Sequence, residues 1–314
     1  MESCVADLAV IILTYNEAQH IERAIRSVAG IAQDIVVVDS YSTDATVELA
    51  RALGARVLQR PFVTQAQQFR WALANAGVDS GWIMRLDADE IIEADLAGEI
   101  AAKLPELPPE VTGIHLNRRH IFMGRWIRHG GRFPLYLLRI WRTGTAQVED
   151  RWMDEHIVLL RGRSVTFRGT FSDCNLRDLT FFTDKHNKYA TREAIEVIRR
   201  RLGGAVEEAG ATLPTQTSYK RWLKEGVYSA FPFHLSSLFY FLYRYFLLRG
   251  FLDGREGLIY HFLQGYWYRF LVGAKITELE RALEPIDDPE AALAELWRLT
   301  GYAPPSPAPQ GAVR

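Results

Sequence analysis

The 314-residue sequence has little cysteine and no excess of charge of either sign. Its two cysteines, Cys4 and Cys174, are too few for a disulfide scaffold or a four-thiolate zinc site, so we expect reduced thiols in a cytosolic protein. The 37 Lys and Arg residues balance 38 Asp and Glu residues, which gives a formal net charge of −1. Because binding along a phosphate backbone needs an excess of Lys and Arg, we expect no nucleic-acid partner.

Long hydrophobic runs and glycine-rich phosphate loops are also missing. The apolar stretch Leu8–Leu13 follows Glu2 and Asp7 rather than a positively charged region, so it predicts a buried strand and not a signal peptide. No uncharged apolar run approaches the ~20 residues that a bilayer-spanning helix needs. Neither G-x-G-x-x-G after the first strand nor G-x-x-x-x-G-K-[ST] occurs. These absences argue against a dinucleotide dehydrogenase and a P-loop NTPase.

The first ninety residues alternate between strand-like and helix-like patterns. We expect strands at Leu8–Thr14, Ile35–Val38, Arg56–Leu58 and Trp82–Leu86. The helices between them are expected after a cap at Asn16 with Gln19 as its capping-box partner, after a cap at Ser42, and over Gln65–Ala76. Strand–helix–strand order at this spacing predicts right-handed crossovers and a parallel sheet covered on both faces, which is an α/β fold.

The middle of the chain has a different pattern. Gly113–Phe122, Tyr136–Arg142 and Asp154–Leu160 resemble strands joined by glycine-rich turns, and they suggest antiparallel additions to the sheet or a flap over its edge. Within them, Arg139 and Arg142 are expected to flank a strand on the acceptor side of a site. Helical periodicity returns at Lys185–Leu202.

Polar clusters follow three of the predicted parallel strands, at residues 14–17, 39–44 and 87–90. Because ligands of open parallel sheets bind outside the carboxyl ends of the strands, these clusters are expected to converge on one site. Asp87 and Asp89 bracket one residue after the fourth strand, and carboxylates in this arrangement suit Mg²⁺ shared with substrate phosphates. A D-x-D tripeptide by itself also occurs as a solvated turn.

Three blocks carry a family resemblance: VIILTYNEAQHIERAIRSV, DIVVVDSYSTDATVELA and GWIMRLDADE, in this order within residues 8–95. They resemble successive blocks of the family 2 glycosyltransferases, which implies the GT-A fold and a nucleotide-diphospho-sugar donor. Weaker likeness at residues 153–157, 185–190 and 250–275 resembles the transferases of lipopolysaccharide core and exopolysaccharide biosynthesis.

The resemblance implies roles for the residues that would bind the nucleotide. Thr14, Tyr15 and Glu17 would line its pocket, and Asp39 would hydrogen-bond the base, most often uracil. Where many relatives have a variant of DDGSTD, this sequence has DSYSTD, so Tyr41 replaces a small residue. That departure bears on the shape of the pocket and on which base it takes.

The resemblance also implies the groups that would perform the transfer. Asp87 would face the ribose or the sugar, and Asp89 would ligate a divalent cation, Mg²⁺ or Mn²⁺, which stabilises the leaving diphosphate. Glu155, with Asp154 as the second candidate, would be the general base that takes the acceptor proton. His156 is either a metal ligand or a hydrogen-bonded structural residue.

About half of the chain's aromatic residues lie between Tyr219 and Phe270, in a region rich in Lys and Arg. Aromatic rings with flanking cations are typical of a helix at the bilayer interface. The alternatives are a packed helical cap on the sheet and a homodimer interface. We expect a catalytic domain over residues 1–180, a helical acceptor and membrane-interface region over 181–300 and a disordered Pro-rich tail over 301–314.

These observations predict an inverting, metal-dependent glycosyltransferase. Its acceptor would be a lipid-linked sugar or lipopolysaccharide core at the inner face of the cytoplasmic membrane, where the protein would be peripheral. The alternatives are the same enzyme with a soluble acceptor, and a non-catalytic membrane-surface protein with a degenerate nucleotide fold. A homo-oligomer is compatible with the sequence.

Overall fold

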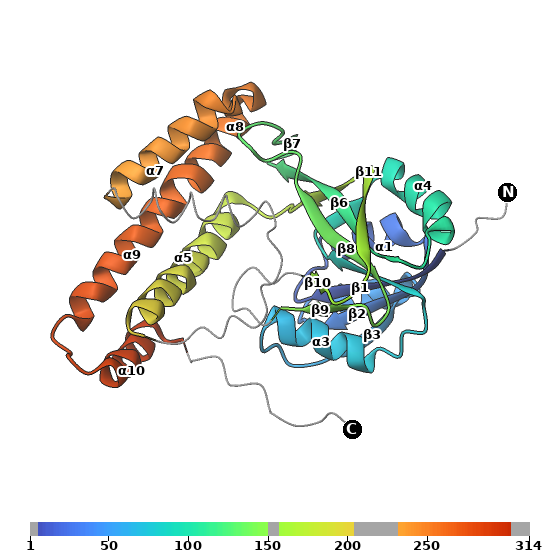
Figure 1. The fold of residues 1–314 in the computed structure, drawn as a ribbon, viewed down its shortest axis with the longest axis horizontal. Coiled ribbons are helices and arrows are strands. Elements are labelled where there is room, and N and C mark those ends of the chain that lie inside the picture. Colours follow the sequence, from blue (N-terminus) through green and yellow to red (C-terminus); the bar gives the residue numbers. More distant parts are fainter. Residues whose placement is uncertain (1–5, 150–156, 204–231, 303–314) are drawn as a thin grey trace. The chain divides into compact units, whose positions relative to one another are not determined.

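The computed structural model describes residues 6–149, 157–203 and 232–302 of the chain. Contacts divide the chain into two compact units, which are described separately. Unit 1 comprises Met1–Leu176 and Gly250–Glu256, and unit 2 comprises Arg177–Arg249 and Gly257–Arg314. Unit 1 contains a mixed sheet with helices on both faces, and unit 2 is helical in its described residues (Figure 1).

The main sheet of unit 1 has the strand order β3-β2-β1-β4-β8-β6-β11-β5, and β7 pairs with β6. The strands are β1 (Ala6–Thr14), β2 (Ala32–Asp39), β3 (Arg56–Gln59), β4 (Trp82–Asp87), β5 (Glu90–Ile92), β6 (Val111–Phe122), β7 (Arg125–Trp126), β8 (Tyr136–Arg142) and β11 (Arg163–Cys174). Strands β3, β2, β1 and β4 are parallel, as predicted. Strand β8 is an antiparallel addition to β4 and β6, which was also expected.

Two pairings depart from the sequence-based expectation. Strand β6 pairs antiparallel with β8, as expected, but it also pairs parallel with β11, a strand that the sequence analysis did not predict. The strand predicted at Asp154–Leu160 is described only over β10 (Ile157–Leu159), and it pairs with β9 (Ala146–Val148) in a separate two-stranded sheet.

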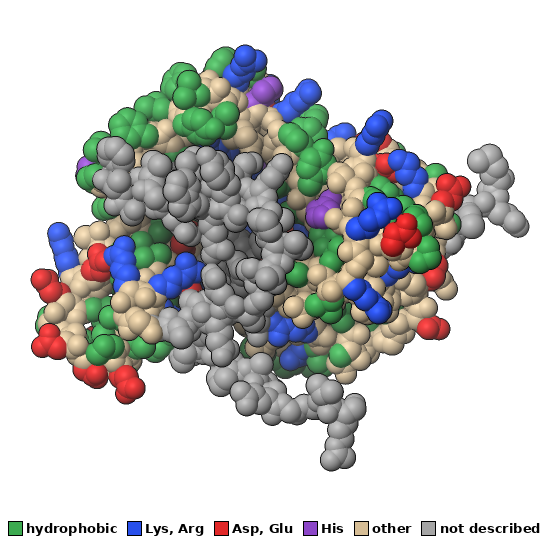
Figure 2. All heavy atoms as spheres, viewed as in Figure 1, with side chains coloured by type: hydrophobic (Ala, Val, Ile, Leu, Met, Phe, Trp, Pro, Cys, Tyr) green, Lys and Arg blue, Asp and Glu red, His purple; other side chains and the backbone are tan. Residues whose placement is uncertain are grey.

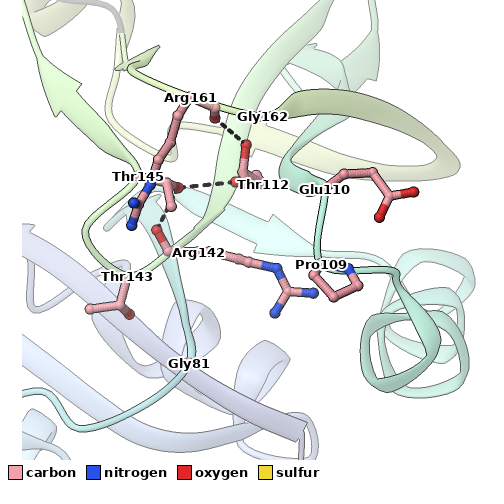
Figure 3. Close-up of a pocket in the computed structure, with 9 residues that line it drawn as sticks. All are labelled: Gly81, Pro109, Glu110, Thr112, Arg142, Thr143, Thr145, Arg161 and Gly162. Atoms are coloured by element: carbon pink, nitrogen blue, oxygen red, sulfur yellow. Dashed lines mark hydrogen bonds between the residues drawn. The ribbon is translucent and has the colours of Figure 1, made fainter.

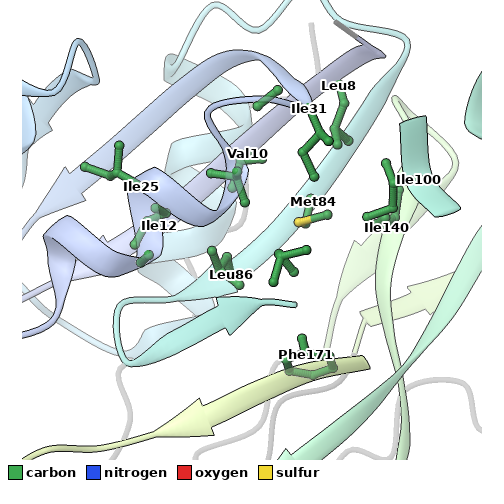
Figure 4. Packing of buried hydrophobic residues seen from close by; sticks show 14 of the residues in the cluster. Leu8, Val10, Ile12, Ile25, Ile31, Met84, Leu86, Ile100, Ile140 and Phe171 are labelled. Atoms are coloured by element: carbon green, nitrogen blue, oxygen red, sulfur yellow. The ribbon is translucent and has the colours of Figure 1, made fainter. Parts of the chain in front are cut away.

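Helices cover both faces of the sheet because the strands alternate apolar side chains between the faces. On one face Leu8, Val10 and Ile12 of β1 pack with α1 (Ile21–Val28), α2 (Thr46–Ala52) and α4 (Ala94–Lys103) (Figure 4). On the other face Ile11 packs with α3 (Gln65–Asn75). Residues 8–12 of β1 are fully buried on both faces, and each large apolar side chain among them contributes roughly 1.5–3 kcal/mol.

The predicted helix caps at Asn16 and Ser42 are wrong. Helix α1 begins at Ile21 after His20, and α2 begins after Ala45, in both cases without a side-chain cap. The side chains of Asn16 and Ser42 instead bond to the neighbouring loop, as described below. These two side chains therefore form hydrogen bonds between the loops after β1 and β2 instead of capping α1 and α2.

The described residues of unit 2 form four longer helices: α5 (Leu179–Arg201), α7 (Phe233–Leu242), α9 (Tyr268–Leu283) and α10 (Pro289–Thr300). Helix α5 begins six residues before its predicted start, because the Asp178 carboxylate caps it by accepting the Phe181 amide over 2.8 Å. One-turn π-helices extend α7 over Tyr243–Leu247 and precede α9 over Phe262–Trp267. Helix α9 packs against α5 and α7. Helix α8 (Gly254–His261) begins in unit 1 and ends in unit 2.

Candidate functional site

Three neighbouring parallel strands end in polar residues at one edge of the sheet. The register pairs Thr14 of β1 with Asp39 of β2, and Leu13 of β1 with Asp87 of β4. The structure thus brings together strand ends that the sequence predicted to converge. This is the edge at which open α/β sheets bind their ligands.

Asp39 is fully buried at this edge, and its carboxylate receives four hydrogen bonds from the chain itself. Oδ1 accepts from the hydroxyls of Thr14, at 3.0 Å, and Ser42. Oδ2 accepts from the Ser42 amide at 2.8 Å and from Nε2 of Gln59 at 3.1 Å. A carboxylate has about four acceptor positions, so a nucleotide base would have to replace one of these donors. Its contact with a base stays a prediction.

The loops after β1 and β2 are joined by their polar side chains. The Asn16 amide donates to the Ser42 hydroxyl, and the Thr43 amide donates to Oδ1 of Asn16, both over 2.8 Å. This bonding holds Asn16 and Tyr41 in the left-handed region, at φ of 54° and 60°. Tyr41 occupies a conformation that favours glycine, which is why a small residue suits this position. Tyr15 is 57% exposed and Tyr41 52% exposed, so both rings face solvent beside the site.

Glu17 faces its own chain rather than an open pocket in this structure. The imidazole of His20 is fully buried, and its Nε2 accepts the Leu176 amide over 2.9 Å. Nδ1 therefore carries the proton and donates to Glu17 over 2.6 Å. Arg23 adds a bond from its guanidinium to the Cys174 carbonyl over 2.9 Å. These contacts connect the loop before α1 and the helix itself to the end of β11.

Asp87 lies between two arginines. Nε of Arg85 and Nη2 of Arg139 each approach its carboxylate to 3.3 Å. Desolvation acts to raise the pKa of Asp87, but the positive charges of Arg85 and Arg139 outweigh it and hold that pKa well below its usual range. Asp87 is therefore an anion whose orientation is fixed by neighbours from β4 and β8.

Glu90 is buried beneath Asp87. It accepts the Asp87 amide over 2.9 Å and pairs with Nη2 of Arg139 at 2.5 Å. Burial raises the pKa of Glu90 to about 8, with Arg139 opposing this change and the Asp87 charge adding to it. Two carboxylates thus share the Arg139 guanidinium, and the one closer to the edge of the sheet is the one that stays ionised.

Asp89 lies beside the end of β11. Nδ2 of Asn175 donates to its Oδ2 over 3.0 Å, and the Cys174 amide donates to its carbonyl over 2.9 Å. Asp89 is half-buried, so its carboxylate is held in place without being enclosed. The predicted base and second metal ligand, Asp154, Glu155 and His156, lie outside the described residues.

The family is decided by a match over half of the chain. Residues 9–166 match the model of glycosyl transferase family 2. The chain belongs to this family. This confirms the family resemblance of the three sequence blocks.

Curated relatives of this glycosyltransferase come from Rickettsia. An uncharacterized glycosyltransferase of Rickettsia bellii is 44% identical over 93 residues, which cover 30% of this chain and 31% of the relative. An uncharacterized glycosyltransferase of Rickettsia typhi is 25% identical over 275 residues, 87% of each chain. The chain thus matches about a third of the length of relatives such as the first one.

Solved structures with similarity include glucosyl-3-phosphoglycerate synthase from Mycobacterium tuberculosis. Its complex with Mn²⁺, uridine diphosphate and glucosyl-3-phosphoglycerate is 20% identical and covers 38% of this chain and 45% of that chain, with a TM-score of 0.29. The complex of the same enzyme with Mg²⁺ and uridine diphosphate gives the same values.

The residues at this edge of the sheet fit a divalent cation that is shared with a substrate. Among the residues described, no three His, Cys, Asp or Glu side chains are grouped to hold a metal by themselves. The Asp89 carboxylate is nevertheless a hard oxygen ligand oriented by an amide, and Mg²⁺ is commonly bound by one or two carboxylates plus substrate phosphates. Asp89 thus suits the cation only together with a bound diphosphate.

Sequence reasoning missed Arg85, His20 and Asn175, and it placed Glu90 in the polar cluster at residues 87–90 without giving it a role. A signal was present for Arg85, because it is a charged residue inside the apolar strand WIMRLD. Arg139 was expected on the acceptor side, and the structure shows that it also contacts Asp87 and Glu90. No local pattern could reveal this contact, because Arg139 lies 52 residues beyond Asp87.

A pocket of about 490 Å³ lies at the other end of the sheet (Figure 3). Its lining includes Gly81, which precedes β4, and Arg142, which ends β8. Nε of Arg142 donates to the Val111 carbonyl over 2.9 Å, and the Thr112 hydroxyl donates to the Arg161 carbonyl over 2.6 Å. These bonds join strand ends. Arg142, which was expected on the acceptor side of the site, lies here, at the end of the sheet away from Asp87.

Proposed function

We propose that this family 2 glycosyltransferase moves a sugar, with inversion at the anomeric carbon, from a nucleotide-diphospho-sugar to an acceptor at the cytoplasmic face of a membrane. The observation that carries the proposal is the meeting of Thr14, Asp39 and Asp87 at the carboxyl edge of three parallel strands. Asp89 follows at the same edge. This places hydrogen-bonding and anionic groups where a nucleotide and its diphosphate would bind.

The exposed rings of Tyr15 and Tyr41 suit the flat faces of a nucleobase. They follow β1 and β2, beside Asp39, so a base between them would reach the strand ends. UDP is the nucleotide that the family resemblance favours. Asp87, held by its two arginines, would accept a hydrogen bond from a ribose or sugar hydroxyl.

A divalent cation, Mg²⁺ or Mn²⁺, would be held by Asp89 together with the donor diphosphate. Bound there, it would offset the charge that develops on the leaving diphosphate. Asn175 orients the Asp89 carboxylate through the bond described above. His156 is the second ligand that we propose.

A single in-line displacement inverts the anomeric carbon and needs a base on the acceptor hydroxyl. We assign this role to Glu155, with Asp154 as the second candidate. The support for this assignment is the resemblance of residues 153–157 to the family pattern. His129 and His120 also lie in unit 1, but each pairs with an aspartate of the chain.

The support for a membrane-bound acceptor is the surface of unit 2. Large apolar side chains on and after α7 are exposed, and hydrophobic atoms gather over this helix in Figure 2. They include Phe239 (54% exposed), Tyr243 (47%), Phe246 (56%) and Leu247 (75%). Such side chains suit the headgroup level of a bilayer. No helix within the described ranges has the length and apolar character to cross a membrane.

The acceptor that this surface favours is a lipid-linked sugar or lipopolysaccharide core. The same enzyme with a soluble acceptor is the alternative, and it would use the exposed apolar residues as a homodimer interface. The solubility of the protein without detergent, and the mass of the particle in solution, distinguish the membrane-bound acceptor from the soluble one. A monomer that requires detergent or lipid supports the membrane acceptor, whereas a soluble dimer supports the alternative.

Thermal unfolding with Mn²⁺ or Mg²⁺ and each of UDP, GDP, CDP, TDP and ADP tests the donor and the cation together. A ligand present at 100 times its Kd stabilises the folded state by about 2.7 kcal/mol. We expect a metal-dependent shift with one nucleotide that Asp89→Ala abolishes. The matched control is Asp79→Ala, an exposed aspartate before β4. A shift that Asp89→Ala leaves unchanged would contradict the metal role, and no shift with any nucleotide would favour a non-catalytic protein.

The base assignment has a separate test. Glu155→Gln should leave nucleotide binding intact and remove sugar transfer, because the amide cannot accept the proton. Release of UDP from a UDP-sugar in the presence of acceptor lipid extract measures transfer. Normal transfer by Glu155→Gln would move the role to Asp154.

A further inference from the structure

Residues 117–134 form a basic hairpin that the proposed chemistry does not use. They contain five arginines and two histidines and no acidic residue, within a chain of net charge −1. Strand β6 turns at Met123 and Gly124, both at positive φ (51° and 78°), into β7. The following loop returns along β6, where the Arg118 amide donates to the Leu135 carbonyl over 2.8 Å. We name residues 117–134 the basic hairpin.

Two of its arginines lie on one indole ring. The guanidinium carbons of Arg119 and Arg128 are 4.8 Å and 5.3 Å from the centre of the Trp126 ring. Phe133 supports the same ring edge-on at 4.9 Å. Cation–π attraction holds each guanidinium, but it does not neutralise the charge of either. Two positive charges are therefore held close together on a fixed aromatic platform.

The carboxylates around the basic hairpin leave one of these charges uncompensated. Arg119 approaches Asp95 at 3.7 Å, and Arg125 approaches Glu256 at 3.8 Å. In the described part of the chain, no carboxylate lies within ion-pair distance of the exposed Arg128. The Arg128 guanidinium thus faces solvent without an ion-pair partner among the described residues, and the Arg119 guanidinium lies on the same ring.

The basic hairpin adjoins the edge that holds the D-x-D residues. Strand register places Ile121 of β6 opposite Cys174 of β11, whose amide donates to the Asp89 carbonyl over 2.9 Å. On the same strands His120 pairs with Asp173 at 3.1 Å. Strands lie about 4.8 Å apart, so β7 is on the order of 14 Å across the sheet from β5, which begins after Asp89. That separation leaves room for an acceptor beside a donor sugar held near Asp89.

We propose that the basic hairpin binds a phosphate group of the acceptor substrate, with Arg128 and Arg119 on Trp126 as its phosphate ligands. Guanidinium groups form paired hydrogen bonds with phosphate oxygens, and their planar shape lets them do so while stacked on a ring. The inference rests on the proposed function, because it names the chemical class of the acceptor: a phosphorylated sugar or a lipid phosphate.

The test uses full-length protein and probe pairs that differ only in phosphate. Farnesyl phosphate is compared with farnesol, and glucose 6-phosphate with glucose, by calorimetric titration in the presence and absence of saturating UDP and Mn²⁺. Arg128→Gln removes the uncompensated charge, and Arg128→Lys restores the charge without the planar fork. The matched control is Arg163→Gln, whose side chain is 61% exposed and which begins β11 at the opposite end of the sheet from Cys174.

We expect a phosphorylated probe to bind the wild type and its unphosphorylated partner not to bind. Arg128→Gln should weaken that binding at least about tenfold, which corresponds to about 1.4 kcal/mol, Arg128→Lys less, and Arg163→Gln not at all. The pair that responds distinguishes a lipid phosphate from a sugar phosphate. Binding of UDP and Mn²⁺ should be the same in all four proteins. If the wild type does not bind UDP and Mn²⁺, the donor proposal fails, and this result is separate from the test of the basic hairpin.

Two results would overturn the inference. One concerns the probes: either no phosphate-dependent binding in either pair, or a loss in Arg163→Gln equal to that in Arg128→Gln, shows that Arg128 is not a specific phosphate ligand. The other concerns phosphatidylglycerol vesicles: if Arg128→Gln loses vesicle binding while probe binding stays intact, the basic hairpin contacts membrane headgroups and not the acceptor.

Discussion

At the scale of single residues, the carboxylates of the site differ in the hydrogen-bond donors and cations that contact them. Asp39 is enclosed by four donors, Asp87 faces two arginines, and Asp89 has an amide on one oxygen. A cation competes poorly with two arginines for a carboxylate. The two arginines therefore favour a hydroxyl over a metal as the partner of Asp87, which is consistent with the roles that we propose for Asp87 and Asp89.

Arg139 is expected to be the most sensitive of the charged residues around Asp87. Arg139→Met would leave the buried Glu90 and the half-buried Asp87 without their shared cation, which should lower the free energy of unfolding by about 3–5 kcal/mol. Urea denaturation measures this loss. The double variant Arg139→Met/Glu90→Gln should recover part of it, because the amide needs no cationic partner and cannot ionise beside Asp87. A double variant no more stable than Arg139→Met would contradict the shared-cation account.

Asp44 gives a prediction about pH. Burial opposes its ionisation, but the Thr46 hydroxyl and the amides of Ala18 and Thr46 outweigh burial and hold the pKa of Asp44 below its ordinary value. A depressed pKa contributes stability that is present above the unfolded-state pKa, near 3.9, and is lost as pH falls through the folded-state value. Asp44→Asn should therefore show a smaller loss of stability below about pH 4. Parallel pH curves of unfolding midpoints would contradict this.

At the scale of elements, the site depends on how α1 and α4 meet β11. His20, just before α1, and Arg23, within α1, both bond to the chain at the end of β11, near Asp89. A shift of α1 would therefore also shift Asp89. Strand β11 approaches α4 closely at Gly169. A Cβ added to Gly169 would lie 2.4 Å from the Cα of Leu96. Backbone contact of this kind has no flexible side chain that could move away.

Gly169→Ala should therefore lower the free energy of unfolding by about 1–3 kcal/mol, because α4 must move away from β11. The matched control is Gly98→Ala in the same helix, where an added Cβ meets nothing within 4 Å. This control should raise stability by about 1 kcal/mol through helix propensity. Chemical denaturation measures the change in the free energy of unfolding for each variant. If Gly98→Ala also lowers it, the loss in Gly169→Ala cannot be assigned to the contact between β11 and α4.

At the scale of the whole molecule, the chain combines a nucleotide-binding type of sheet with a helical unit that exposes aromatic residues. Part of the aromatic-rich region expected at a membrane, residues 219–231, lies outside the described residues. The remainder contains exposed side chains such as Phe246 and Leu247, which do not contribute to a core. Scattered exposed apolar residues are normal on proteins, whereas a gathering of large ones marks an interaction surface.

Binding to vesicles tests the role of this surface. We expect the wild type to sediment with vesicles of phosphatidylglycerol and phosphatidylcholine, and Phe246→Ser/Leu247→Ser to weaken this binding about tenfold or more, since each buried apolar side chain contributes roughly 1.5–3 kcal/mol. The matched control, Phe62→Ser, replaces a residue of unit 1 that is 58% exposed and should have no effect. Loss of a dimer in the double variant, with vesicle binding unchanged, would assign the surface to self-association.

Sequence alone determined the parallel half of the sheet and the convergence of its polar ends. Strands buried on both faces need nearly continuous apolar runs, and residues such as Thr14, Asp39 and Asp87 follow those runs directly. The family resemblance came from the same blocks, because they carry both the strands and the groups at their ends. These are local patterns, so they can be read without knowing what lies across the sheet.

Only the tertiary structure decided what each of those groups contacts. Arg139 reaches Asp87 across 52 residues, and the Leu176 amide reaches His20 across 156. The parallel pairing of β6 with β11 and the stacking of Arg119 and Arg128 on Trp126 likewise depend on strand order and on a turn. A buried charge takes its partner from whichever strand lies beside it, and that neighbour is set by packing of the whole sheet rather than by any segment of sequence.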